Sequence, residues 1–142
     1  MIYFFVAGEP KAQPRPRATR RGGFVGVYNP DTADAWKKLV AISAKPHRPS
    51  VPMDGAVRLA LTFFFERPKS HLRKSGALRH GYPIFHIAKP DCDNAAKAVM
   101  DVLTTAGFWR DDSQVAALNV CKRYADAPDA IEGCAVSVEA FR

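Results

Sequence analysis

The sequence predicts an α/β (α+β) fold, in which one small domain spanning residues 1–142 packs a mixed β-sheet against two main helices. Three observations support this prediction. Residues 57–65 alternate as in a half-buried strand, and two segments, one starting at 29–32 and one at 93, repeat apolar residues at helical spacing. Shorter β-branched and aromatic runs at 2–6, 24–28, 114–124 and 134–141 supply further strands. A chain of 142 residues is long enough to bury one core.

Composition indicates a basic protein with a polyanionic partner. Lys and Arg number 21 against 14 for Asp and Glu, a net charge of +7. This balance favours nucleic acid first and an anionic membrane second. No apolar run approaches the roughly 18 residues of a membrane span, and the start of the sequence lacks the features of a secretory leader. Three cysteines without a C-x-x-C pair indicate reduced, mostly buried thiols, so we expect a cytoplasmic protein that does not act on membranes.

The segment 11–21 is the first candidate contact for DNA. It holds five cations and no acid, and its prolines keep it extended before a turn at Gly22-Gly23. A solvated loop and a phosphate-tracking arm both explain this composition. In the second interpretation the phosphate contacts come from Lys11, Arg15 and Arg17.

The first helix is expected to begin at Asn29-Pro30-Asp31-Thr32 and to end at Lys45-Pro46. Trp36 heads its apolar stripe, so it is predicted to be a core residue and not a platform for base stacking. After the strand at 57–65 comes a long irregular segment, 66–89, with six cations and the single acid Glu66. Such a loop is usually functional or disordered. Its candidate DNA contacts are Arg67, Lys69, Arg73, Lys74 and Lys89.

An acidic motif follows this loop, at Lys89-Pro90-Asp91-Cys92-Asp93-Asn94. If the segment is extended, Asp91 and Asp93 point the same way and can share one ion, while Cys92 faces the core. The helix over 93–106, stopped by Gly107, would then carry Asn94, Lys97 and Asp101 on one polar face.

A second acidic pair, Asp111-Asp112, lies where the chain returns from this helix, so one of its members can point back toward the motif. Three carboxylates with open positions for water and a phosphate describe a Mg²⁺ site, and a nearby lysine can neutralise growing charge.

The acids also have simpler interpretations. Asp91 and Asp93 could be helix-capping acids, and Asp111-Asp112 a turn. A calcium loop starting at Asp91 fails, because its sixth position is Ala96 and its twelfth is Val102. No glycine loop for a nucleotide is present, so no nucleotide cofactor is expected. A nuclease explains the acids and the surrounding cations together.

Two blocks of the sequence stand in order: Lys89-Pro90-Asp91-x-Asp93-Asn94-x-x-Lys97-x-x-x-Asp101, then Gly107-Phe108-Trp109-x-Asp111-Asp112-x-Gln114-Val115. Gly8-x-Pro10-Lys11 and Arg15-Pro16-Arg17 precede them. Together they resemble the signature of the RusA-type Holliday junction resolvases, the crossover junction endodeoxyribonucleases. The resemblance implies a small homodimer that nicks four-way DNA junctions with Mg²⁺, for which Mn²⁺ is expected to substitute. By position it implies that Asp91, Asp93 and Asp112 are catalytic metal ligands and that Lys97 assists catalysis, with Asn94, Asp101 and Asp111 in support.

The sequence therefore predicts a Mg²⁺-dependent endodeoxyribonuclease that resolves branched DNA by paired nicking. A less selective structure-specific nuclease and a non-catalytic protein that binds junctions or other DNA remain as alternatives. The feature that separates them is the joint presence of Asp91, Asp93, Lys97 and Asp112, because binding alone does not require this set.

Overall fold

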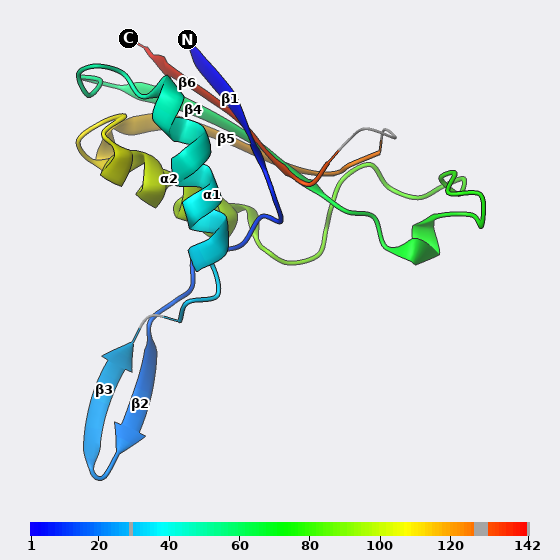
Figure 1. Ribbon diagram of the computed structural model, residues 1–142, viewed down its shortest axis with the longest axis horizontal. Coiled ribbons are helices and arrows are strands. Elements are labelled where there is room, and N and C mark those ends of the chain that lie inside the picture. The colour runs from blue at the N-terminus through cyan, green and yellow to red at the C-terminus, as the bar shows by residue number, and fades with distance from the viewer. Residues whose placement is uncertain (29, 127–130, 142) are drawn as a thin grey trace.

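The computed structural model describes residues 1–28, 30–126 and 131–141. Its main sheet contains β1 (Ile2–Ala7), β4 (Val57–Phe65), β5 (Val115–Tyr124) and β6 (Gly133–Ala140), in the order β1-β6-β4-β5. Strands β4 and β5 run parallel, whereas β6 is antiparallel to both β1 and β4. The sheet is therefore mixed, and two helices lie beside it (Figure 1), which confirms the predicted fold class.

Strand β4 lies between β6 and β5, and its alternation buries one face completely. Val57, Leu59, Leu61, Phe63 and Phe65 are all buried, while most residues between them are half-buried. Removing apolar area from water is the main stabilising contribution of such a strand. The predicted strands at 114–124 and 134–141 are confirmed to within one residue at either end.

Helix α1 (Asp34–Ala44) packs on this core through Trp36, Val40 and Ala44, which confirms Trp36 as a core residue. The helix begins later than expected, because Asp31 to Asp34 form a turn in which the Asp34 amide donates to the Asp31 carbonyl oxygen at 3.0 Å. No side chain caps the helix at Ala33. Asn29, part of the expected start, lies outside the described residues. The helix ends as predicted before Pro46, where the short 3₁₀ turn η1 (Lys45–His47) follows.

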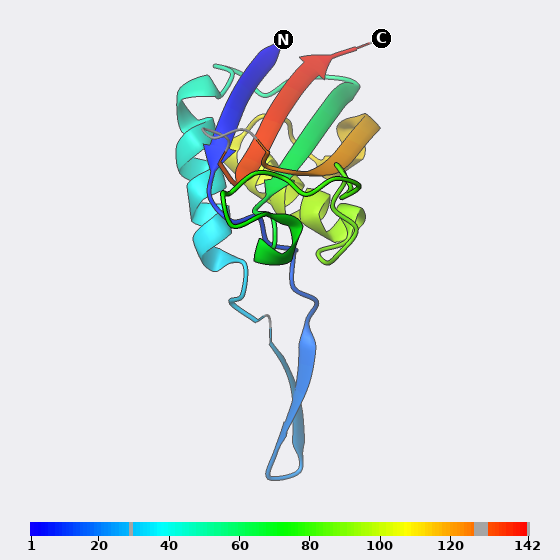
Figure 2. The ribbon, with the colours of Figure 1, turned by 90° about the vertical axis from the view of Figure 1, so that its right-hand side faces the viewer.

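Within the segment 11–21, expected to be a solvated loop or a phosphate-tracking arm, residues 17–21 form one strand of a hairpin. β2 (Arg17–Arg21) pairs antiparallel with β3 (Phe24–Tyr28) in a separate two-stranded sheet that stands clear of the body (Figures 1 and 2). Gly22 and Gly23 connect the strands with φ of 54° and 88°. Positive φ at both central residues is what a two-residue hairpin turn requires, and glycine adopts it without steric cost.

A second projection is formed by the segment 66–91 between β4 and α2 (Figure 1). It contains only the short 3₁₀ turn η2 (Lys69–His71) and two isolated bridges, Leu72 to Leu78 and Phe85 to Arg123. The last bridge ties the returning part of the loop to β5.

Helix α2 (Cys92–Ala106) buries Ala95, Ala96, Ala98, Val99 and Leu103 in the core that it shares with the sheet and α1, and it ends at Gly107, whose φ is 88°. The prediction of a helix over 93–106 with a glycine stop is confirmed. Among the described residues, no helix is both long enough and apolar enough to cross a bilayer.

Candidate active site

The first acidic motif lies at the start of α2. Asp91 is extended, with φ −68° and ψ 150°, but Cys92 is already the first helical residue. The expectation that Asp91 and Asp93 share one side of an extended segment was therefore wrong, and Cys92 is exposed instead of facing the core. The physical reason is that the chain turns into a helix one residue earlier than the period-two argument assumes.

The same geometry bears on the capping interpretation. Asp91 occupies the N-cap position, yet its side chain makes no capping hydrogen bond to the helix. Both Asp91 and Asp93 are exposed, at the helix end where free N–H groups favour negative charge. Their carboxylates are thus open to a ligand from solvent.

Long-range contacts fix the segment that carries Asp91. The Lys122 ammonium on β5 donates to the carbonyl oxygens of Ala88 and Pro90, each at 2.7 Å. On the other side, the Gln13 amide donates to the Asn94 carbonyl oxygen at 3.0 Å. The start of α2 is therefore held between the base of the hairpin and the end of the basic loop.

The second acidic pair forms a compact turn after α2, continued by the 3₁₀ turn η3 (Asp112–Gln114). Asp111 accepts a hydrogen bond from the Ser113 backbone amide at 2.8 Å. Hydrogen bonding from the Ser113 side chain, and then from this amide, lowers the pKa of Asp111. Gln114 accepts from the Arg110 and Asp111 amides, and its own amide donates to the Met53 carbonyl oxygen at 2.9 Å. Asp111 and Gln114 thus complete a capping box that sets the position of Asp112.

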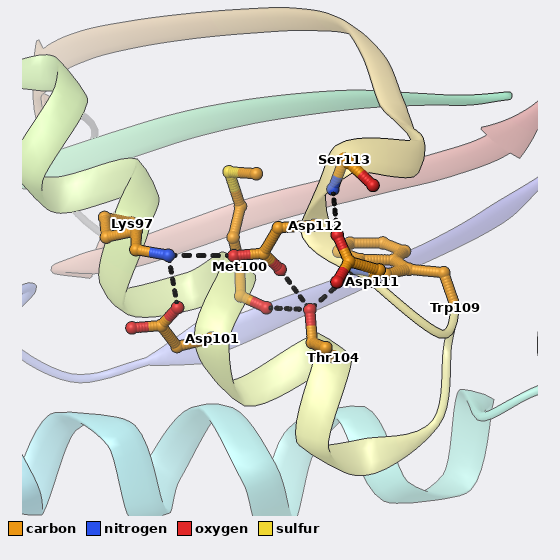
Figure 3. A network of polar contacts seen from close by, with 8 residues as sticks. All are labelled: Lys97, Met100, Asp101, Thr104, Trp109, Asp111, Asp112 and Ser113. Atoms are coloured by element: carbon orange, nitrogen blue, oxygen red, sulfur yellow. Dashed lines mark hydrogen bonds and ion pairs between the residues drawn. The ribbon is translucent and has the colours of Figure 1, made fainter.

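Asp112 points to Lys97 and Thr104 on α2 (Figure 3), whereas one member of the pair was expected to point toward Asp91 and Asp93. The Lys97 ammonium lies 2.9 Å from Asp112 Oδ2 and 2.8 Å from Asp101 Oδ1. Thr104 contacts the other Asp112 oxygen, and the Trp109 indole N–H donates to Thr104 Oγ1 at 2.7 Å. Two helical residues, Lys97 and Thr104, therefore hold the Asp112 carboxylate.

The network controls the charge of its members. The hydrogen bond to Asp101, followed by that to Asp112, raises the pKa of Lys97 above its usual range. Partial burial raises the pKa of Asp112, but the bonds to Thr104 and Lys97 outweigh it, so the pKa lies below the ordinary value. Lys97 is therefore cationic and Asp112 anionic at neutral pH.

The donor chemistry fits a hard cation, because all three predicted ligands are carboxylates. The structure does not, however, bring Asp91, Asp93 and Asp112 together as a ready chelate. Across residues 1–28, 30–126 and 131–141, no three His, Cys, Asp or Glu side chains lie close enough to hold a metal ion. Instead, the Asp112 carboxylate is engaged by Lys97 and Thr104.

Cations flank the acids in two adjoining recesses. An open groove of about 610 Å³ beside Asp91 and Asn94 is lined by Lys11 and Lys89, and also by the acids Glu9 and Glu132. A second recess shares Lys11 and Asn94 and is bounded by Arg15 and Arg17 at the root of the hairpin. Lys69, Arg73 and Lys74 are exposed farther out on the loop.

Arg67 was predicted to contact DNA, but it is buried, with 7% of its surface exposed. Both carboxylate oxygens of Asp126 pair with its guanidinium, and His71 Nδ1 lies 3.1 Å from it. The guanidinium also lies 4.5 Å from the centre of the Tyr124 ring, a cation–π contact. The pKa of Arg67 is raised by its bond to Asp126. Arg67 therefore anchors the base of the loop and is not free for a phosphate.

Sequence reasoning missed four residues that organise the site: Thr104, Trp109, Gln114 and Lys122. Trp109 and Gln114 were visible as part of the second motif, but their roles depend on contacts that only the fold creates. Lys122 carried no local signal, since its two hydrogen-bond partners lie 32 and 34 residues away in the sequence.

These features define a small α+β protein whose acidic site lies between two basic projections, an arrangement suited to processing nucleic acid. Residues 7–132 match the family described as Endodeoxyribonuclease RusA, and the chain belongs to this family. It is also 36% identical, over 129 residues, to the uncharacterized protein YqaN of Bacillus subtilis (strain 168). That alignment covers 89% of this chain and 90% of YqaN.

Proposed function

We propose that the protein is a Mg²⁺-dependent endodeoxyribonuclease that resolves four-way DNA junctions by paired nicking, with Mn²⁺ able to replace Mg²⁺. The observation that carries the proposal is the position of the acids. Asp91 and Asp93 at the start of α2 stand between the roots of two cationic projections, and Lys97, one turn farther along the helix, pairs with Asp112. Membership of the RusA family supports the same activity.

Asp91, Asp93 and Asp112 would hold the metal ion, which supplies polarisation of the phosphodiester and a more acidic water. Lys97 presents a fixed positive charge beside Asp112, where it can neutralise charge that develops on a phosphate oxygen. Asp101 keeps that ammonium on the polar face of α2. Thr104 and the capping box of Asp111 hold the direction of Asp112.

The test of this function is nicking of a synthetic four-way junction beside a linear duplex of the same sequence, in Mg²⁺, Mn²⁺ or EDTA. We expect metal-dependent cuts in the junction and far fewer in the duplex. Lys97→Ala should slow the chemical step more than it weakens binding, because the ammonium acts on charge that appears during reaction. Binding without cutting under all conditions would instead support a protein that only binds junctions.

We also infer that the active species is a homodimer. A four-way junction requires a matched cut in each of two strands, and the chain offers one set of Asp91, Asp93, Lys97 and Asp112. Two subunits related by a twofold axis supply two such sites. Light scattering at micromolar concentration should give a dimer mass with and without junction. A monomer mass in both, with uncoupled nicks in a cruciform plasmid, would contradict this inference.

A further inference from the structure

The β2–β3 hairpin exposes several large apolar side chains to solvent. Phe24 is 81% exposed, Val25 65% and Val27 73%, and Tyr28 is half-exposed. Contiguous apolar surface of this kind on a protein usually marks an interaction site. The hairpin also stands away from the sheet and helices (Figures 1 and 2), so the described core does not cover it.

The charge of the hairpin indicates which partner covers it. The stretch 11–28 holds five cations and no acid. Within the described part of the chain, Arg15, Arg17 and Arg20 form no ion pair, and all three lie on or next to β2. A strongly cationic ribbon complements a polyanion far better than it complements a second copy of a chain with net charge +7.

The register of the hairpin places cations on both of its faces. Residues directly opposite in an antiparallel pair share a face, and neighbours in one strand alternate. Arg17 therefore shares a face with its partner Tyr28, whereas Arg20 shares the other face with its partner Val25. A groove of duplex DNA has a phosphate backbone on each side, and the major groove, about 12 Å wide, admits a two-stranded ribbon.

The root of the hairpin connects this surface to the acids. The backbone N–H of Gln13, four residues before β2, donates to the Asn94 carbonyl oxygen in the first turn of α2. The recess at the root is lined by Arg15 and Arg17 together with Asn94. DNA that follows the hairpin to its base thus arrives at the start of α2, where Asp91 and Asp93 lie.

We propose that the β2–β3 hairpin enters the major groove of one duplex arm of the substrate, with Arg17 and Arg20 contacting phosphates of opposite strands. Val25 and Val27 then contact the groove, where thymine methyl groups offer apolar surface. This proposal rests on the proposed function, since it assigns an arm of the same DNA to a named part of the chain.

The experiment measures binding alone, in EDTA, by fluorescence anisotropy on a labelled junction and on a linear duplex. Arg17→Ala with Arg20→Ala should weaken affinity for both DNAs at least tenfold. It should also reduce the slope of log affinity against log salt by about 1.8, the value for two lost phosphate contacts. Methylation of guanine N7 by dimethyl sulfate reports on the major groove, so the parent protein should protect N7 in one arm and the variant should not.

The matched control is Lys38→Ala with Lys45→Ala, which removes the same charge from exposed positions on α1 and η1 and should leave affinity and slope unchanged. Equal affinity and slope for the arginine variant and the parent would overturn the proposal, as would absent N7 protection. Val25→Ser with Val27→Ser should weaken DNA binding at constant mass. If it instead converts a dimer to a monomer, the hairpin binds a second copy and the proposal is wrong. A parent protein that binds through the hairpin but never nicks would refute the proposed function only.

Discussion

Thr104 offers the sharpest test of the site, because one hydroxyl serves both a buried tryptophan and an acid. Thr104→Val keeps the shape of the side chain but removes the acceptor of the Trp109 indole N–H and a hydrogen-bond partner of Asp112. Trp109 is only 1% exposed, so its N–H loses its partner without access to water. Leaving a buried donor unpaired costs about 1–3 kcal/mol.

The Asp112 part of the loss is smaller. Its side chain is 27% exposed and keeps Lys97, so water and the ammonium replace part of the lost bond. We therefore expect a total loss of about 1.5–3 kcal/mol in the free energy of unfolding. At about 3 °C per kcal/mol for a chain of this length, Tm should fall by about 5–9 °C. Nicking should fall by about tenfold or more, because small misplacement of a catalytic group is costly.

Thermal melts followed by circular dichroism, and junction nicking, measure the two effects. Thr105→Val is the matched control, since the neighbouring threonine is exposed and lies outside the network. Thr104→Ser keeps the hydroxyl and should recover most of the activity. If the free energies of unfolding of Thr104→Val and Thr105→Val agree within about 0.5 kcal/mol, the range usual for surface substitutions, the reasoning fails.

The stability difference between the parent and Thr104→Val should depend on pH through the pKa of Asp112, which lies below the ordinary value of about 3.9. A depressed pKa contributes stability above the unfolded pKa, and this contribution is lost as pH falls through the folded pKa. The stability difference between the parent and Thr104→Val should therefore narrow as pH falls below about 4 and the folded carboxylate becomes protonated. A difference that stays constant from pH 7 to pH 3 would assign the whole effect to Trp109.

Two further predictions concern the acids and the loop. Asn substitution at each proposed metal ligand, Asp91, Asp93 or Asp112, should abolish nicking, while junction binding measured by gel shift survives. Near-normal cutting by any one variant would show that its residue is not a metal ligand. Arg73→Ala with Lys74→Ala should flatten the salt dependence of junction affinity by about 1.8 if both residues contact phosphates, and an unchanged slope would place the DNA elsewhere.

The elements that sequence alone could predict are those whose signals are local. In strand β4 every second residue is apolar and buried, and in helix α2 the buried residues recur at helical spacing. Gly107 marks the end of the helix. The hairpin was predicted only in part. β2 lacks apolar alternation because neither of its faces packs on the core, and only the Gly22-Gly23 turn shows that the two strands pair.

The candidate site divides in the same way. The order and spacing of the acids within the chain resemble one family of nucleases, and the family match confirms that resemblance. The predicted directions of the side chains around Asp91 were wrong. Cys92 and Asp93 were misplaced because the start of α2, one residue earlier than expected, changes the direction of every side chain after Asp91.

By itself, then, the sequence determined the fold class, since the periods of strands and helices are local, and it indicated the family through motifs that resemble it. Only the tertiary structure decided which charges are free. Arg67 is buried where Asp126, 59 residues away, pairs with it, and Lys122 on β5 holds the carbonyl oxygens of Ala88 and Pro90 in the loop before Asp91. Burial and pairing of a charge depend on partners that are distant in the chain, and folding alone brings those partners together.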